Sequence, residues 1–425
     1  MVIERQNKDG FVENGEAREA IGEFFSQNGY GGKRVLLIVP DNTRSGPIGD
    51  IFKMIYGCLD GNAKALDVLI ALGTHPALTE EGICTRLGIT PSERSSKYAS
   101  VKFFNHEWER PETFTSIGRI SADEIYQISD GLFSEEVDVS INKLIFEYDE
   151  FFILGPVFPH EVVGFSGGHK YIFPGIAGDE IINFFHWLSG VITNPVINGN
   201  KWTPTRHVVE KAASFIEMPH KLFAVVSADK KLKGLFIGDC VAAWEKAADL
   251  SRDVHIIYKD KPYHTILGIA PKMYDDLWTA AKVMYKLEPI VADGGTVIIY
   301  APHITELSYT HGKFLDRIGY HTRDYFLKRM DKFTGIPRGV IAHSTHVKGI
   351  GTYIDGVEKP RIKVVLATGI SKERCENANL DYMDPEAINV ADYENREDEG
   401  ILVVQHAGEV LHRLSSGYIP TIANE

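Results

Sequence analysis

The stretch Glu150-Phe-Phe-Ile-Leu-Gly-Pro-Val-Phe158 decides the fold, because after Glu150 it is an unbroken apolar run of strand length. A strand that is apolar on both faces is typical of a parallel sheet covered by helices. This run leads into His160-Glu-Val-Val-Gly-Phe-Ser-Gly-Gly-His-Lys170, and His186 follows 16 residues later. Imidazoles, a glycine-rich turn and a primary amine therefore gather beyond one buried strand, which favours a cofactor site over packing.

Short apolar runs alternate with amphipathic stretches along the chain, and this pattern predicts α/β architecture. We expect two Rossmann-like α/β domains with mostly parallel sheets and the active site in the interdomain cleft. The expected strands are residues 34–39, 66–72, 151–157, 222–226, 264–269, 296–300 and 361–368. The expected helices are residues 14–27, 49–59, 179–188, 240–251 and 274–287.

The length of 425 residues predicts two domains. We place their boundary near the turn-forming segment Lys259-Asp-Lys-Pro262. An N-terminal cofactor-binding domain then spans residues 1–260, and a C-terminal domain spans residues 261–397. A last strand at residues 401–404 is expected to bring segment 398–425 back to the first domain.

The composition, with 44% hydrophobic and 24% charged residues, is that of a soluble globular protein. The net charge of −13 argues against nucleic acid as a partner. The 4 cysteines form no CxxC pair, and the N-terminus has no apolar signal-peptide core, so we expect a cytoplasmic protein. No apolar run approaches membrane-spanning length, and no membrane partner is expected.

Three expected strands end in reactive residues. Asp41-Asn-Thr-Arg44 follows the first, Gly73-Thr-His75-Pro76 the second, and Pro159-His160 the third. Ligands of open parallel sheets bind at the carboxyl ends of strands, so these residues are expected to converge on one crevice. Each also has a structural alternative, because Asp41-Asn-Thr is a good helix cap and both histidines adjoin prolines of turns.

The loop Gly164-Phe-Ser166-Gly167-Gly168 matches G-x-S-x-G, the nucleophile elbow of α/β-hydrolases. A serine or metal-dependent hydrolase is therefore the alternative function, although about six residues separate the strand from the serine, unlike the tight elbow. A Walker A reading fails because no Ser or Thr follows Lys170. Consecutive glycines nonetheless expose backbone N–H groups that suit a phosphate.

Three further side chains can be explained either by ordinary packing or solvation or by a role in chemistry. Lys170 is either solvated or a covalent or phosphate-binding amine. His186 lies among apolar and aromatic residues, so it is either a core histidine or a metal ligand. Lys282 lies in the middle of an expected helix, where it faces either solvent or the cleft.

Together these motifs resemble the nickel-dependent lactate racemase family. Asp41-Asn-Thr-Arg44 is similar to the family's S-D-H-T-R segment, and Gly73-Thr-His75-Pro76 to its T-G-x-H-R-P segment. The interval from His160 to Lys170 and the spacing to His186 match the family pattern. Lys282 stands in a match to its Q-A-V-K helix, and the resemblance covers about residues 33–300.

The resemblance implies a nickel pincer nucleotide, a pyridinium ring whose two sulfur arms and one ring carbon bind nickel. Lys170 would tether it through a thioamide, and His186 would be the protein ligand of nickel. Gly164, Ser166, Gly167 and Gly168 would lie near the cofactor. Separate cofactor-maturation proteins are implied partners.

The implied reaction is racemisation or epimerisation of a 2-hydroxy acid by reversible hydride transfer at C2. His75 and His160 would be the acid and base on opposite sides of the substrate. Arg44 and Lys282 would anchor its carboxylate, and Asp41 would orient a neighbouring group. A non-catalytic binding protein that keeps the fold is a further alternative.

The chain departs from the family where a substrate would be recognised. Thr279 replaces a glutamine, and Asn42 replaces a histidine. The smaller threonine predicts a longer or polyhydroxy acid, such as an aldonate, in place of lactate. Its extra hydroxyls are expected to meet residues of the divergent C-terminal part, namely His321, Arg323 or His346.

Overall fold

The buried run around residue 150 forms β7 of a seven-stranded sheet in the computed structural model, which describes residues 1–43 and 45–421. Every residue of β7 is buried. The strands from β10 to β4 are parallel, and β11 and β1 extend the sheet with antiparallel pairs. In order across the sheet they are β1 (Ile3–Gln6), β11 (Lys231–Gly238), β10 (His220–Ala228), β7 (Glu150–Pro156), β2 (Arg34–Pro40), β3 (Ala65–Ala71) and β4 (Phe103–Asn105).

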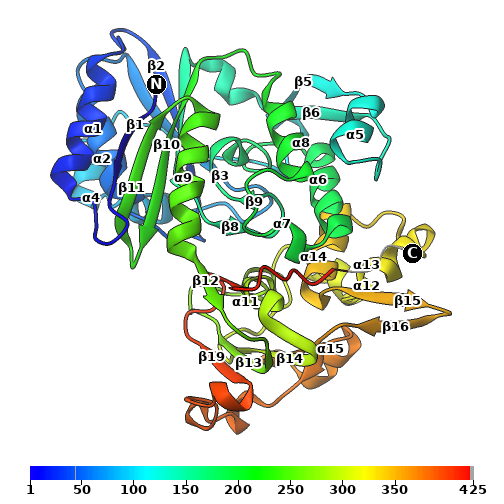
Figure 1. Ribbon diagram of the computed structural model, residues 1–425. Coiled ribbons are helices and arrows are strands. Elements are labelled where there is room, and N and C mark those ends of the chain that lie inside the picture. Colours follow the sequence, from blue (N-terminus) through cyan, green and yellow to red (C-terminus); the bar gives the residue numbers. More distant parts are fainter. Residues whose placement is uncertain (44, 422–425) are drawn as a thin grey trace. The chain divides into compact units, whose positions relative to one another are not determined.

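Helices pack on both faces of this sheet (Figure 1). On one face, α1 (Asn14–Ser26) and α2 (Ile48–Leu59) share a core with alternate residues of the strands. On the other face lies α9 (Cys240–His255), whose Trp244 is fully buried. A capping box between Glu13 and Glu16 begins α1, and its apolar residues recur at helical spacing.

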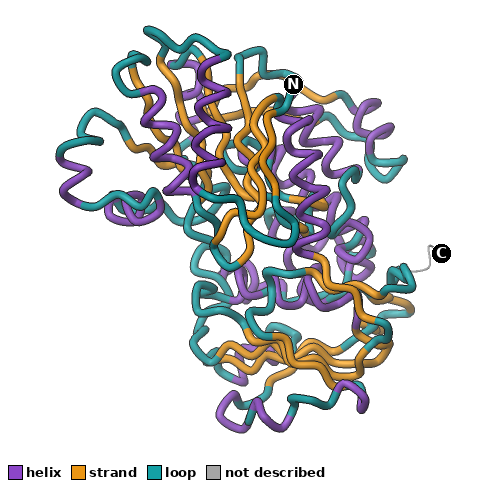
Figure 2. Tube along the Cα trace, turned by 60° about the vertical axis from the view of Figure 1, so that its left-hand side comes forward, coloured by secondary structure: helices purple, strands orange, loops and turns teal. Residues whose placement is uncertain are grey.

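A second sheet has five strands, all parallel, in the order β18-β17-β14-β13-β19. Figure 2 shows the strands of each sheet running side by side among helices. The strands are β13 (Tyr263–Ile269), β14 (Val291–Ala301), β17 (Lys363–Thr368), β18 (Asp381–Tyr382) and β19 (Ile401–Val404).

Shorter elements complete the chain. The remaining strands form two-stranded pairs: β5 (Phe114–Ile120) with β6 (Val137–Asn142), β8 (Pro159–His160) with β9 (Gly164–Phe165), β12 (Ile256–Lys259) with β20 (Leu411–Leu414), and β15 (Gly351–Ile354) with β16 (Val357–Pro360). The other α-helices are α3 (Glu80–Arg86), α4 (Pro91–Ser95), α5 (Ala122–Ile128), α6 (Asp179–Ile192), α7 (Asn194–Ile197), α8 (Pro204–Ala213), α10 (Leu277–Ala280), α11 (Lys282–Leu287), α12 (Gly312–Ile318), α13 (Arg323–Leu327), α14 (Arg338–Lys348) and α15 (Lys372–Asn377). The 3-10 turns that matter below are η3 (Gly168–Tyr171) and η4 (Glu288–Ile290).

The chain divides into two compact units. The N-terminal unit comprises Met1–Phe158, Phe165–Ile182 and Arg206–Val254, and the C-terminal unit comprises Pro159–Gly164, Asn183–Thr205 and the chain from His255 on. The last change of unit falls between Val254 and His255, whereas the sequence placed the boundary near residue 260. His160 and His186, however, fall in the C-terminal unit, which corrects their assignment to a continuous domain of residues 1–260.

The expected α/β class with mostly parallel sheets is confirmed, and two of the local expectations are wrong. Residues 401–404 do not return to the first sheet, because β19 pairs in parallel with β13 of the second. The helix expected from residue 274 begins only at Leu277, because the Asp276 side chain accepts the Thr279 N–H and caps it there. It then breaks at Ala281, so Lys282 is the first residue of α11.

Within the described residues, no helix is long and apolar enough to cross a membrane.

Candidate active site

An aspartate and a histidine meet at the edge of the first sheet where β2 and β3 end. Asp41 follows β2 directly, and His75 lies in the turn after β3. The Asp41 Oδ2 and His75 Nδ1 atoms are 2.6 Å apart. The buried carboxylate also accepts the Thr43 hydroxyl at 2.7 Å. With its Nδ1–H donated to Asp41, the His75 ring presents Nε2 as its proton-accepting atom.

The His75 turn is held by its backbone. The His75 N–H donates to the Leu72 carbonyl at 3.0 Å, and the Trp108 indole N–H donates to the His75 carbonyl at 3.0 Å. The structure thus adds Trp108 to the residues that position this histidine. No motif around Trp108 pointed to that role.

The segment carrying Lys170 lies at the same edge of the sheet. The Tyr171 hydroxyl donates to the Pro156 carbonyl at 2.9 Å, which ties η3 to the end of β7. The Gly73 N–H donates to the Gly175 carbonyl at 3.0 Å and joins the His75 turn to the loop beyond Lys170. The Asp41–His75 pair and the segment of the half-buried Lys170 therefore lie beyond the ends of neighbouring parallel strands. Arg44 lies outside the described residues.

The serine of the glycine-rich loop has a structural role. Its hydroxyl accepts the Phe158 N–H at 2.9 Å and lies 3.2 Å from the Pro156 carbonyl, to which it donates. Ser166 is only 2% exposed. A nucleophilic serine needs a base that takes its proton, whereas this hydroxyl is engaged by the backbone. The geometry therefore does not support a serine hydrolase that uses Ser166.

Gly167 and Gly168 are required by close packing behind the loop. Both have positive φ angles, of 87° and 61°. A Cβ at Gly168 would lie 2.7 Å from Nη2 of Arg206, which is itself fully buried and donates to the Gly167 carbonyl at 3.0 Å. The Trp244 indole N–H donates to the Ser166 carbonyl at 2.9 Å. The loop is thus fixed by two side chains that the sequence patterns did not single out.

Gly164 allows the backbone of Asn200 to pass close to its own. We expect Gly164→Ala to lower the free energy of unfolding by about 3 kcal/mol. Its φ is +79°, and an added Cβ would lie 1.7 Å from the Asn200 carbonyl oxygen. The control is Gly57→Ala in α2, where no atom lies within 4 Å of the new Cβ and a gain of about 0.5–1 kcal/mol is expected. Urea unfolding measures both. Equal midpoints for the two variants would contradict the close crossing.

His160 is buried and has a defined hydrogen bond in the C-terminal unit. Its Nδ1 accepts the Val162 N–H at 3.1 Å, while the Glu161 carboxylate lies further from the same atom, at 3.5 Å. An accepting Nδ1 in a neutral ring leaves the proton on Nε2. His160 therefore presents an N–H donor, whereas His75 presents an acceptor.

His186 lies on α6 and is half-buried, with its ring stacked 4.6 Å from that of Phe185. The Ser189 hydroxyl donates to the His186 carbonyl at 2.5 Å and accepts from His346 Nε2 at 2.9 Å. Burial lowers the pKa of His346 to about 4, so this ring is neutral near pH 7. The backbone carbonyl of His186 is therefore held by Ser189, and the role of its imidazole as a metal ligand stays a prediction.

Thr279 and Lys282 lie around the break between α10 and α11. The Thr279 hydroxyl donates to Asp276, 2.9 Å from its Oδ1, so the threonine helps to begin α10. Burial raises the pKa of Asp276. The Lys282 ammonium lies 4.7 Å from the centre of the Tyr274 ring, within cation–π range.

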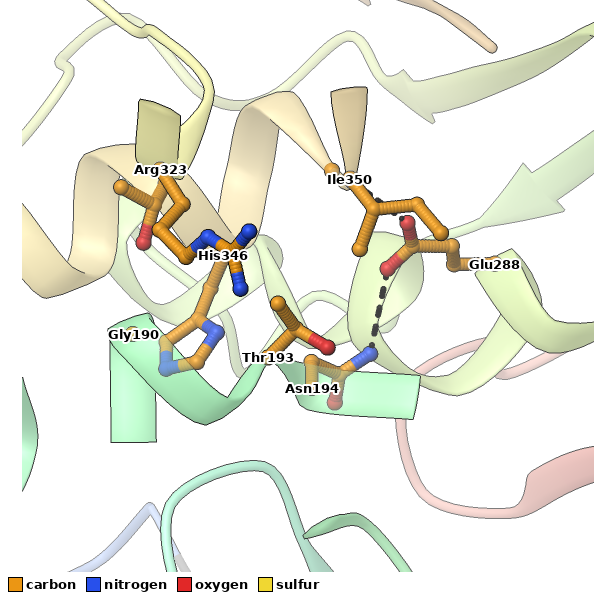
Figure 3. A pocket seen from close by; sticks show the side chains of 9 residues that line it. Gly190, Thr193, Asn194, Glu288, Arg323, His346 and Ile350 are labelled. Atoms are coloured by element: carbon orange, nitrogen blue, oxygen red, sulfur yellow. Dashed lines mark hydrogen bonds between the residues drawn. The ribbon is translucent and has the colours of Figure 1, made fainter. Parts of the chain in front are cut away.

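A small polar cavity in the C-terminal unit is lined by Arg323, His346 and Glu288 (Figure 3). Glu288 is fully buried, accepts from the Ile350 N–H at 2.9 Å, and has its pKa raised by burial. Arg323 donates to the Val191 carbonyl at 3.0 Å. Both residues, like His346, thus have protein partners here, and so does His321, whose Nδ1 lies 2.7 Å from Glu358. Contact of these residues with substrate hydroxyls remains a prediction.

Each of the two units is built on a mostly parallel sheet, which defines a Rossmann-like α/β protein. In the first unit a histidine–carboxylate pair and a lysine lie beyond the strand ends, which makes this edge the candidate catalytic one. Residues 19–197 match the sequence model described as the lactate racemase N-terminal domain. This match covers less than half of the chain, and over it the sequence is similar to lactate racemases.

Two curated relatives carry the name lactate racemase. The protein of Lactiplantibacillus plantarum is 26% identical over 277 residues, and that of Thermoanaerobacterium thermosaccharolyticum is 27% identical over 281 residues. Each alignment covers 64% of this chain and 60% of the relative. The chain thus matches about three fifths of the length of these relatives.

Two solved structures share the fold. A Thermotoga maritima protein from a structural genomics programme is 31% identical, with a TM-score of 0.89, over 97% of this chain and all of that one. The lactate racemase apoprotein of T. thermosaccharolyticum is 20% identical, with a TM-score of 0.67, over 93% of each chain. The fold is therefore shared over nearly the whole chain, including the part after residue 303 where we found little sequence match.

Proposed function

We propose that this chain is a racemase or epimerase that inverts C2 of a 2-hydroxy acid. The observation that carries the proposal is the Asp41–His75 pair, which lies at the same sheet edge as Lys170. A histidine fixed through Nδ1 by a buried carboxylate is suited to proton transfer at Nε2. The names of the curated relatives supply the reaction class.

The residues present fit a nickel pincer nucleotide. Lys170 supplies a half-buried primary amine in a loop that is held by hydrogen bonds at Ser166 and Tyr171. His186 supplies an imidazole nitrogen on a helix. The soft donor set of such a group, completed by one imidazole, suits four-coordinate nickel. When bound, this group supplies the acceptor and donor of hydride at C2.

His75 would remove and return the proton of the substrate hydroxyl. Asp41 holds Nδ1–H, so the Nε2 lone pair faces outward from the pair. When Nε2 takes a proton, the carboxylate 2.6 Å away stabilises the resulting imidazolium. The proton then leaves from the same nitrogen, which makes the transfer reversible.

His160 would serve the opposite side of the substrate. Because Nδ1 of His160 accepts the Val162 N–H, the Nε2–H of this ring can donate a hydrogen bond to a carbonyl oxygen of the planar keto form. Accepting a proton at Nε2 would require Nδ1 to give up that backbone bond. The two neutral rings thus have different tautomers in the structure, and either ring can act as the acid only after it has become an imidazolium.

The substrate's carboxylate would be bound by Arg44 and Lys282. Thr279 lies two helix positions before Ala281 with its hydroxyl already engaged by Asp276. It therefore offers a smaller, more apolar surface than an amide side chain would. We propose on this basis a longer or polyhydroxy acid as the substrate.

Asp41→Asn is expected to lower kcat about 10²–10⁴-fold, because the neutral amide no longer fixes the tautomer or stabilises the imidazolium. The matched control is Thr43→Val, which removes a hydroxyl that donates to Asp41 but keeps its charge. It should lose less than about tenfold, since one hydrogen bond contributes about 0.5–1.5 kcal/mol. Steady-state rates with the loaded enzyme measure both. Equal losses would assign Asp41 a packing role only.

The function is tested with untagged protein co-expressed with cofactor-maturation proteins. Intact mass, nickel content and C2 inversion are measured on a panel from lactate to aldonates. Stoichiometric nickel with inversion of an aldonate supports the whole proposal, and lactate as the best substrate would contradict only its substrate class. Protein without nickel, adduct or activity, beside a lactate racemase that matures in the same host, would overturn the function.

A further inference from the structure

Four side chains outside the proposed catalytic machinery meet inside the N-terminal unit. His169 lies on η3, His220 at the start of β10, and Cys240 at the start of α9. Their ligand atoms lie within 4.8 Å of one another. Glu210 of α8 lies behind His169. These segments are far apart in the sequence and carry no metal-binding motif.

Each imidazole is held through its Nδ1 atom. His169 Nδ1 lies 2.6 Å from a Glu210 carboxylate oxygen, and His220 Nδ1 donates to the Met218 carbonyl at 2.8 Å. The two Nε2 atoms consequently point at each other, 3.0 Å apart. Metal-bound histidines almost always donate their other nitrogen to a carboxylate or a backbone carbonyl, which orients the ring. Both of those partners are present here.

We infer that His169, His220 and Cys240 form a zinc site, with Glu210 and the Met218 carbonyl orienting the two imidazoles. Two nitrogen ligands at about 2.0–2.1 Å from a tetrahedral zinc lie about 3.3 Å apart, so the observed separation needs little change. Two imidazoles and one thiolate are ligands that zinc prefers. A fourth position is left for water.

Cys240 supplies the sulfur ligand from the first residue of the 16-residue helix α9. Cys240 is 2% exposed, and His220 is half-buried. The ring of His220 stacks on Phe151 at 4.9 Å, which limits its motion.

A bound zinc would join η3, β10 and α9 through one point. His169 directly precedes Lys170, so the ion would fix the turn that carries this lysine. The alternative occupant of the same space is a proton shared between the two Nε2 atoms. The inference does not depend on the proposed racemase activity, because the zinc ligands are not residues of that machinery.

The test uses untagged full-length protein, made without maturation proteins and stripped of metal with a chelator. After zinc is added back and the excess is dialysed away, we expect one zinc per chain. Co²⁺ added in place of zinc should give a thiolate-to-cobalt charge-transfer band. Cys240→Ser and His220→Gln should each weaken zinc binding about 100-fold or more, and Glu210→Gln about 10–100-fold. Cys84→Ser, at another buried cysteine, should bind as the wild type does.

Direct cobalt spectra of the wild type keep the test decisive even if a variant fails to fold. Wild-type protein that retains no zinc after dialysis would overturn the site and leave the shared proton as the occupant. A cobalt complex without the thiolate band would also overturn it, as would equal zinc affinity of the wild type and a folded Cys240→Ser variant. None of these results bears on C2 inversion, so failure of the zinc site and failure of the racemase proposal are distinguishable.

Discussion

Lys170→Ala is expected to give a folded chain with no covalent adduct and no measurable C2 inversion, a loss of at least about 10³-fold. The lysine is the one amine in the loop between Ser166 and Tyr171, which is anchored at both of those residues. Alanine removes the nucleophilic nitrogen but leaves both anchors. Because the Lys170 side chain is half-buried, the free energy of unfolding should change by only about 1 kcal/mol.

Intact mass of protein co-expressed with maturation proteins measures this effect. Lys221→Ala, at a half-buried lysine of β10, is the control and should keep the adduct. His186→Ala separates tether from metal ligand, since it should keep the organic adduct but lose nickel. An adduct that persists in Lys170→Ala would move the attachment point elsewhere and contradict the proposed site.

Three central strands of the first sheet could be predicted because nearly all of their residues are apolar. β2, β3 and β7 were each expected within one or two residues of their observed bounds, whereas β1, β4 and β11 were not expected. The pairing partner of a short strand cannot be predicted from local composition. The partner of β19 is β13, which precedes it by more than 130 residues, and no local pattern in Ile401–Val404 distinguishes the two sheets.

The candidate site likewise has one part that the sequence predicts and one part that it does not. The meeting of Asp41 and His75 follows from the rule that parallel strands end at one edge, so sequence alone could predict it. The support behind the glycine loop could not be predicted, because Arg206 and Trp244 reach it from separate helices. An arginine in a helix normally indicates a solvated face, and only the folded chain shows this one fully buried.

His75→Gln is expected to lower kcat about 10²–10⁴-fold while nickel and adduct remain at wild-type levels. Glutamine can still donate a hydrogen bond toward Asp41, so the buried carboxylate keeps a partner, but it cannot accept and return a proton. The His75 side chain is 29% exposed, and the fold should lose only about 1 kcal/mol. His264→Gln, an exposed histidine on β13, is the control and should be fully active.

Single-turnover experiments separate a proton-transfer role from a structural one. If His75 and His160 serve opposite sides, His75→Gln should block formation of the keto acid from one enantiomer and spare it from the other. His160→Gln should show the reverse preference, because for that enantiomer His160 would take the hydroxyl proton at Nε2 once its own proton has moved to Nδ1 and the bond from the Val162 N–H is given up. An equal loss of activity with both enantiomers in both variants would contradict the proposal that the two histidines act on opposite sides of the substrate. An unchanged kcat in His75→Gln would remove this histidine from the mechanism.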